Sequence, residues 1–126
     1  MAFSLSARIK SFRHAFHGIY MVVKREPNAW IHLAATVSVV ALGFYESLSI
    51  LEWCVIVLAI GLVWVAEAAN TAIEYLANEV TREQREGIGL AKDVGAGAVL
   101  LASICSVVLG ALVFVPHFLV WWETRP

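Results

Sequence analysis

The stretch from Glu67 to Glu74, which reads EAANTAIE, places two carboxylates inside a long apolar run. A charged side chain in a transmembrane segment costs about 2.5–3.5 kcal/mol at the helix centre, so it is by default a candidate functional group. At about 100° per residue, a helix collects the polar side chains here on one stripe about 100° wide. These are Glu67, Asn70, Thr71, Glu74 and Asn78. Two acids and amides on one face could accept a proton or bind a cation.

Three more charged groups belong to the same membrane boundary. Glu26 precedes the first apolar segment, and Lys92 and Asp93 open the last one. One lysine neutralises one carboxylate, so the surplus acid indicates a bound divalent cation. Oxygen ligands suit Mg²⁺, which keeps waters and is held by one or two carboxylates plus substrate phosphates. The alternative is that the buried acids only pair with Lys92 or cap neighbouring backbone.

Phosphoryl transfer is one chemistry that this inventory can support. It requires positioning, neutralisation of phosphate charge by metal, and a group that accepts the proton of the attacking hydroxyl. A site at the membrane edge also gives access to a water-soluble nucleotide and to a lipid headgroup. The sequence has no Walker loop and no soluble-kinase HRD or DFG set.

The composition predicts one all-α membrane domain over residues 1–126. Of these residues 60% are apolar and the mean hydropathy is +0.77, both above soluble averages. An amphipathic surface helix is expected over about 4–25, because its apolar residues recur at helical spacing. Membrane spans are expected at about 29–46, 50–77 and 91–121, with a charged aqueous connection at 78–89. The net charge of −1 gives no reason to expect a nucleic-acid partner.

The basic residues predict the orientation. They cluster before the first span and around the second connection: Arg8, Lys10, Arg13, Lys24, Arg25, Arg82, Arg85 and Lys92. The positive-inside rule then places the N-terminus in the cytoplasm of a multi-pass protein. At a rise of about 1.5 Å per residue, Glu67 lies about 25 Å along the second span and Glu74 about 10 Å further, toward the cytoplasmic edge. The outer boundary offers only Glu46 and Glu52, with no basic partner in sight.

Two motifs resemble a known family. EAANTAIE at 67–74, followed by AKDVGAGAVLL at 91–101, closely resembles the signature of the bacterial integral-membrane diacylglycerol kinases, which include undecaprenol kinases. The resemblance covers nearly the whole chain, through HAFHGI at 14–19, REPNAWIHL at 25–33 and LVFVP at 112–116. The NAWIHL and GFYESLSILEW stretches are more similar to the undecaprenol kinase branch.

The resemblance implies a homotrimer in the bacterial inner membrane, with active sites between subunits. It implies that ATP and Mg²⁺ are used to phosphorylate a lipid alcohol, undecaprenol or diacylglycerol, at the cytoplasmic interface. By position, Glu67 resembles the catalytic base, and Asn70 and Lys92 resemble groups that orient it and contact the nucleotide phosphates. The substrate contacts are then Glu67 and Asn70, and the metal ligands Glu26 and Glu74. The implied nucleotide site comprises Lys92, Asp93, Glu74, Glu26 and Arg8.

One position departs from the family pattern. The family usually has Asp four residues after the second signature glutamate, and this chain has Asn78, which carries no charge. His32 is interpreted as a packed or interface histidine. Two other classes of function stay open: a small proton-coupled transporter with Glu67 as its ion-binding carboxylate, and a purely structural membrane oligomer. The acids lie at one membrane edge, whereas transporter sites usually lie at the midplane.

Overall fold

A computed structural model describes residues 4–83 and 85–124 of the chain, and within them every regular element is a helix. Four helices follow one another: α1 (Leu5–Arg25), α2 (Pro27–Tyr45), α3 (Ile50–Val80) and α4 (Glu86–Glu123). α2, α3 and α4 are long and apolar enough to cross a membrane. The predicted all-α fold with three apolar helices is therefore confirmed, whereas the limits of the membrane-spanning parts remain predictions.

Local sequence explains where the helices begin and end. Glu26 is the only residue between α1 and α2, and Pro27 opens α2, where its missing N–H costs nothing. A capping box opens α3: the Ser49 hydroxyl accepts from the backbone N–H of Glu52, and the Glu52 carboxylate accepts from the backbone N–H of Ser49. These signals fix the bend at Glu26 and the tight turn before α3.

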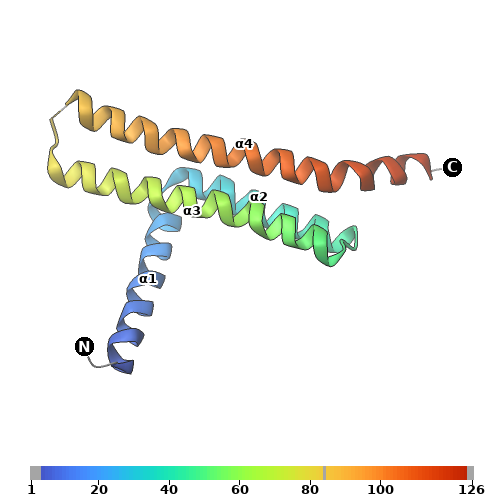
Figure 1. The fold of residues 1–126 in the computed structure, drawn as a ribbon, viewed down its shortest axis with the longest axis horizontal. Coiled ribbons are helices and arrows are strands. Elements are labelled where there is room, and N and C mark those ends of the chain that lie inside the picture. The colour runs from blue at the N-terminus through green and yellow to red at the C-terminus, as the bar shows by residue number, and fades with distance from the viewer. Residues whose placement is uncertain (1–3, 84, 125–126) are drawn as a thin grey trace.

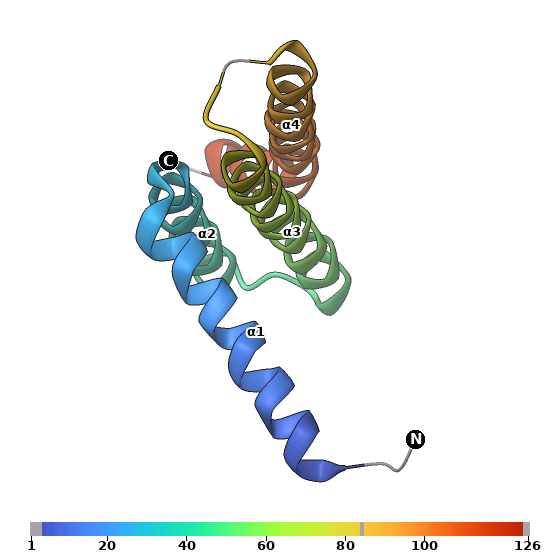
Figure 2. The same cartoon turned by 90° about the vertical axis from the view of Figure 1, so that its left-hand side faces the viewer.

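The helices α2, α3 and α4 lie side by side with α3 in the middle, as Figures 1 and 2 show. α3 and α4 form a long antiparallel hairpin, and α2 packs on α3. α1 leaves the bundle at a steep angle, and its N-terminal end lies away from the other helices in both views. Large apolar side chains on α1 are exposed: Leu5, Ile9, Phe12, Phe16, Ile19 and Tyr20.

The connection between α3 and α4 is shorter than the charged segment at 78–89 suggested. α3 continues to Val80 and α4 begins at Glu86, so only 81–85 separate the two helices. Charged residues are good helix formers in water, and both helices therefore extend into the polar segment.

Glu46 and Glu52, at the end of the bundle where α2 meets α3, have a basic partner. His117 of α4 lies with Nε2 2.8 Å from Oε1 of Glu52 and with Nδ1 3.8 Å from Oε2 of Glu46. The expectation that these acids lack a basic partner was wrong, because the hairpin returns a residue 65 positions after Glu52 to the same end of the bundle. His117 thereby ties the end of α2 and the start of α3 to α4.

Removing His117 should lower the stability of the end of the bundle where α2 meets α3. We expect His117→Leu to lower the thermal midpoint of unfolding, because Glu52 loses its hydrogen bond to His117 and Glu46 loses a nearby imidazole. The measurement is the thermal midpoint of the purified protein in detergent. His14→Leu on exposed α1 is the matched control. An equal midpoint in His117→Leu and wild type would show that the contact does not stabilise the fold.

Candidate active site

Glu67 is the most unusual side chain of the bundle. It is only 2% exposed, although it is a carboxylate on a mainly apolar helix. Its Oε2 atom is buried and has no hydrogen-bond partner among the described residues. Thr71, one turn later on α3, is likewise buried with an unpartnered hydroxyl. Buried polar atoms are nearly always paired in folded proteins, so these exceptions mark a place where another molecule can bind.

His32 of α2 faces this carboxylate. Its Nε2 atom lies 3.6 Å from Glu67 Oε2, and it too is buried without a hydrogen-bond partner in the described chain. The sequence was interpreted as giving a packed or interface histidine at position 32, and this proximity to Glu67 was not predicted. The only available signal was a titratable side chain six positions after Glu26, within the segment that resembles the family.

Asn70 and Glu74 continue the same stripe of α3. The Asn70 amide donates from Nδ2 to Oε1 of Glu74 over 3.3 Å, and its Oδ1 is buried without a partner. Gly95 of α4 packs directly against that oxygen: a methyl group added at Gly95 would overlap Asn70 Oδ1. The glycine in the AKDVGAGAVLL motif is therefore what lets α4 approach the polar stripe of α3.

Glu26 belongs to the same group of acids. Partial burial raises the pKa of Glu26 above its ordinary value of 4.5, and the negative charges of Glu74 and Glu67 raise it further. Like charges raise a carboxyl pKa only when they are near one another, so three acids from two segments share one electrostatic environment. Glu26 therefore lies within electrostatic reach of Glu74 and Glu67, and a shared role for the three acids stays a prediction.

These acids suit Mg²⁺ better than a metal ion whose ligands are all protein side chains. Within residues 4–83 and 85–124, no three side chains of His, Cys, Asp or Glu are grouped closely enough to hold an ion by themselves. Mg²⁺ is usually bound by one or two carboxylates, with water and substrate phosphates completing its shell. Glu26 and Glu74 could supply such a pair, since the negative charge of Glu74 contributes, after partial burial, to the raised pKa of Glu26.

The Glu26 carboxylate should make Mg²⁺ binding sensitive to acid. The ionised form binds the cation, so Mg²⁺ affinity should fall as the pH is lowered through the raised pKa of Glu26. Without metal, acid has the opposite effect, on the stability of the fold. Protonation of Glu26 stabilises the folded state, fully so below pH 4.5, and this contribution is lost as the pH rises through the raised pKa.

The measurement is the Mg²⁺-induced rise in thermal midpoint from about pH 5 to 8. Glu26→Gln should reduce this rise, and Glu79→Gln, at an exposed acid of α3, should not. A rise that is equal in Glu26→Gln and wild type would show that Glu26 does not bind the ion.

The other predicted site residues do not reach Glu67 within one chain. Lys92 donates from Nζ to Oδ1 of Asn78 over 2.7 Å. Asn78, the residue that departs from the family pattern, therefore accepts a hydrogen bond from Lys92. Asp93 is exposed. Arg8 lies in the first turn of α1, at the end that points away from the bundle.

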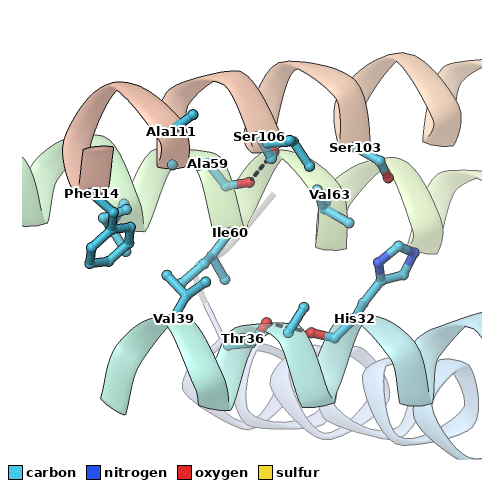
Figure 3. Close-up of a pocket in the computed structure, with 14 residues that line it drawn as sticks. His32, Thr36, Val39, Ala59, Ile60, Val63, Ser103, Ser106, Ala111 and Phe114 are labelled. Atoms are coloured by element: carbon cyan, nitrogen blue, oxygen red, sulfur yellow. Dashed lines mark hydrogen bonds between the residues drawn. The ribbon is translucent and has the colours of Figure 1, made fainter. Parts of the chain in front are cut away.

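A mainly apolar cavity of about 400 Å³ runs along α3 between α2 and α4. Figure 3 shows His32 at one end and Phe114 at the other. Its walls are small or aliphatic, with residues such as Ala35, Ala59 and Ile60. The cavity suits a hydrocarbon chain, and the end marked by His32 adjoins the buried carboxylate.

Comparisons with known proteins identify the family of the chain. The family model described as prokaryotic diacylglycerol kinase matches residues 13–114. The chain is 39% identical to undecaprenol kinase of Bacillus subtilis over 112 residues, covering 89% of this chain and 91% of that protein. It is 34% identical to diacylglycerol kinase of a Synechocystis species over 110 residues, 86% of this chain and 63% of the relative. With Escherichia coli diacylglycerol kinase it shares 29% over 97 residues, 71% of this chain and 80% of the relative.

The matched range contains every acid of the site and the cavity that adjoins it. The family match supports a lipid kinase, and a transporter is not favoured. The chain belongs to the prokaryotic diacylglycerol kinase family and is a lipid kinase.

Proposed function

We propose that the protein transfers the γ-phosphoryl group of ATP to the hydroxyl of a membrane lipid alcohol, with Mg²⁺, at the cytoplasmic membrane interface. The observation that carries the proposal is Glu67: a carboxylate that is 2% exposed and has an oxygen without a hydrogen-bond partner among the described residues. A base that accepts the hydroxyl proton must lie where a lipid hydroxyl can reach it. Glu67 meets this requirement on a helix suited to the membrane.

The neighbouring residues can then be given distinct tasks. Asn70 orients the base and contacts the substrate, since its amide already bonds to Glu74 and its Oδ1 is free to accept. Glu26 and Glu74 hold Mg²⁺ with water and phosphate oxygens, and the ion supplies positive charge to the transferring phosphoryl group. Lys92 moves from Asn78 to the nucleotide phosphates, where Asp93 and Arg8 complete the nucleotide site.

Undecaprenol is the proposed acceptor. Among the relatives described above, the undecaprenol kinase shares 39% identity and nearly equal length, whereas the diacylglycerol kinases share 34% and 29%. The cavity along α3 is also lined mainly by apolar side chains, which suit a hydrocarbon chain. Diacylglycerol is the alternative acceptor.

We also propose that the active unit is a homotrimer with sites shared between subunits. Lys92 and Asp93 of α4 and Arg8 of α1 do not converge on Glu67 of their own chain. Shared sites would bring these residues from one subunit to the acids of another. The steep angle of α1 and its exposed apolar side chains suit a helix lying on the membrane surface, with the basic N-terminus in the cytoplasm.

The test is transfer of labelled phosphate from ATP to undecaprenol and to diacylglycerol in mixed micelles, with and without Mg²⁺. We expect Mg²⁺-dependent formation of undecaprenyl phosphate at a higher kcat/KM than phosphatidic acid. Failure to phosphorylate either lipid would overturn the proposal. Mass measurement of the protein in detergent tests the trimer separately.

A further inference from the structure

His32 and Glu67 place two buried polar atoms close to one another. Nε2 of His32 and Oε2 of Glu67 are 3.6 Å apart, and both lack a hydrogen-bond partner among the described residues. This separation is too long for a hydrogen bond between them. One oxygen atom at about 2.8 Å from each would satisfy both.

The chemistry of the two atoms identifies what that oxygen must be. A carboxylate oxygen only accepts hydrogen bonds, whereas a neutral imidazole with its proton on Nε2 donates one. A hydroxyl group both donates and accepts, so it can donate to Glu67 and accept from His32. Resting on the function proposed above, we propose that His32 binds the acceptor hydroxyl of the lipid alcohol and holds it against Glu67.

The fold orients the His32 ring for this task. The Thr36 hydroxyl donates to the His32 carbonyl oxygen over 2.7 Å and accepts from Trp64 Nε1 over 3.1 Å. The Trp64 ring also meets the His32 ring edge-on, with centroids 6.4 Å apart. Trp64 lies one turn before Glu67 on α3, so its contacts with Thr36 and with the His32 ring join α2 to α3 next to the carboxylate.

The cavity explains how the lipid reaches this pair. His32 forms the polar end of the apolar cavity, and Val63, one turn before Glu67, also lines it (Figure 3). A hydrocarbon chain in the cavity would deliver its terminal hydroxyl to the His32 end. In the reaction the hydroxyl O–H bond breaks and its proton passes to Glu67. The oxygen forms a bond to the γ-phosphorus, and the bond from that phosphorus to the bridging oxygen breaks to release ADP.

The experiment compares His32→Leu and His32→Gln in the full-length protein in mixed micelles with undecaprenol and ATP. We expect His32→Leu to lower kcat/KM for undecaprenol about tenfold or more through loss of one hydrogen bond, and to leave the KM for ATP unchanged. Glutamine places an N–H donor near the position of His Nε2, so His32→Gln should recover most of the loss. His117→Leu is the control, because it removes a histidine at the opposite end and affects stability only.

Each outcome decides the proposal. Wild-type kcat/KM for undecaprenol in His32→Leu would overturn it, as would equal losses in both variants with thermal midpoints like wild type. If His32→Leu does not fold, His32→Gln alone decides, because a packing role predicts loss and a hydroxyl contact predicts recovery. Failure of the underlying function is distinguishable, since wild type would then phosphorylate no lipid alcohol.

Discussion

Glu67→Gln is expected to lower kcat for lipid phosphorylation by about 10²–10⁴-fold, the usual contribution of a general base. Glutamine has nearly the same shape as glutamate, so packing against α2 is kept, but an amide cannot accept the hydroxyl proton. Because Glu67 is buried, the test separates loss of activity from loss of stability: a neutral amide costs less to bury than a carboxylate. Stability should therefore be equal or higher while activity is lost.

The measurement is labelled phosphate transfer to undecaprenol at saturating ATP, together with the thermal midpoint in detergent. Glu79→Gln is the matched control, since it makes the same change at an exposed acid on the same helix. Wild-type kcat in Glu67→Gln would remove Glu67 as the base. Equal losses in both variants would point to a general effect of charge at the membrane edge.

Gly95→Ala is expected to lower kcat/KM about tenfold or more, although Gly95 carries no functional group. The added methyl would overlap Asn70 Oδ1, so either the Asn70 side chain rotates away or α4 moves off α3. Overpacking of this kind typically costs about 1–3 kcal/mol. Displacement of a positioning residue by about 1 Å can cost about 10²-fold in rate. Rotation of Asn70 would break its bond to Glu74, and movement of α4 would displace the residues of α4 from the polar stripe of α3.

Gly97→Ala is the matched control, because a methyl group there meets nothing within 4 Å and the motif, helix and substitution are the same. The measurements are kcat/KM for undecaprenol and for ATP, with the thermal midpoint. Equal activity of Gly95→Ala and Gly97→Ala would show that close approach of α4 to Asn70 is not needed for the reaction.

Much of this protein could be predicted from the sequence, because those features depend on neighbours along the chain. The three apolar helices follow from runs of hydrophobic residues, which must be longer than about 17 residues to cross a bilayer. The stripe of Glu67, Asn70 and Glu74 follows from helical periodicity alone. The approach of Glu26 to these acids follows from the alternation of spans. Local periodicity and span order thus determined the fold class and the acidic part of the site.

The partners of these acids were decided only by the tertiary structure. His32 next to Glu67, His117 next to Glu46 and Glu52, and Lys92 on Asn78 are contacts between different helices. Such contacts depend on the rotation of each helix about its axis and on its offset along the neighbour. Both are set by the packing of residues on different helices, such as Gly95 of α4 against Asn70 of α3. The periodicity of a single helix does not encode this packing. The sequence by itself therefore determined which groups could react, and the packing of α2 and α4 on α3 decided which groups meet.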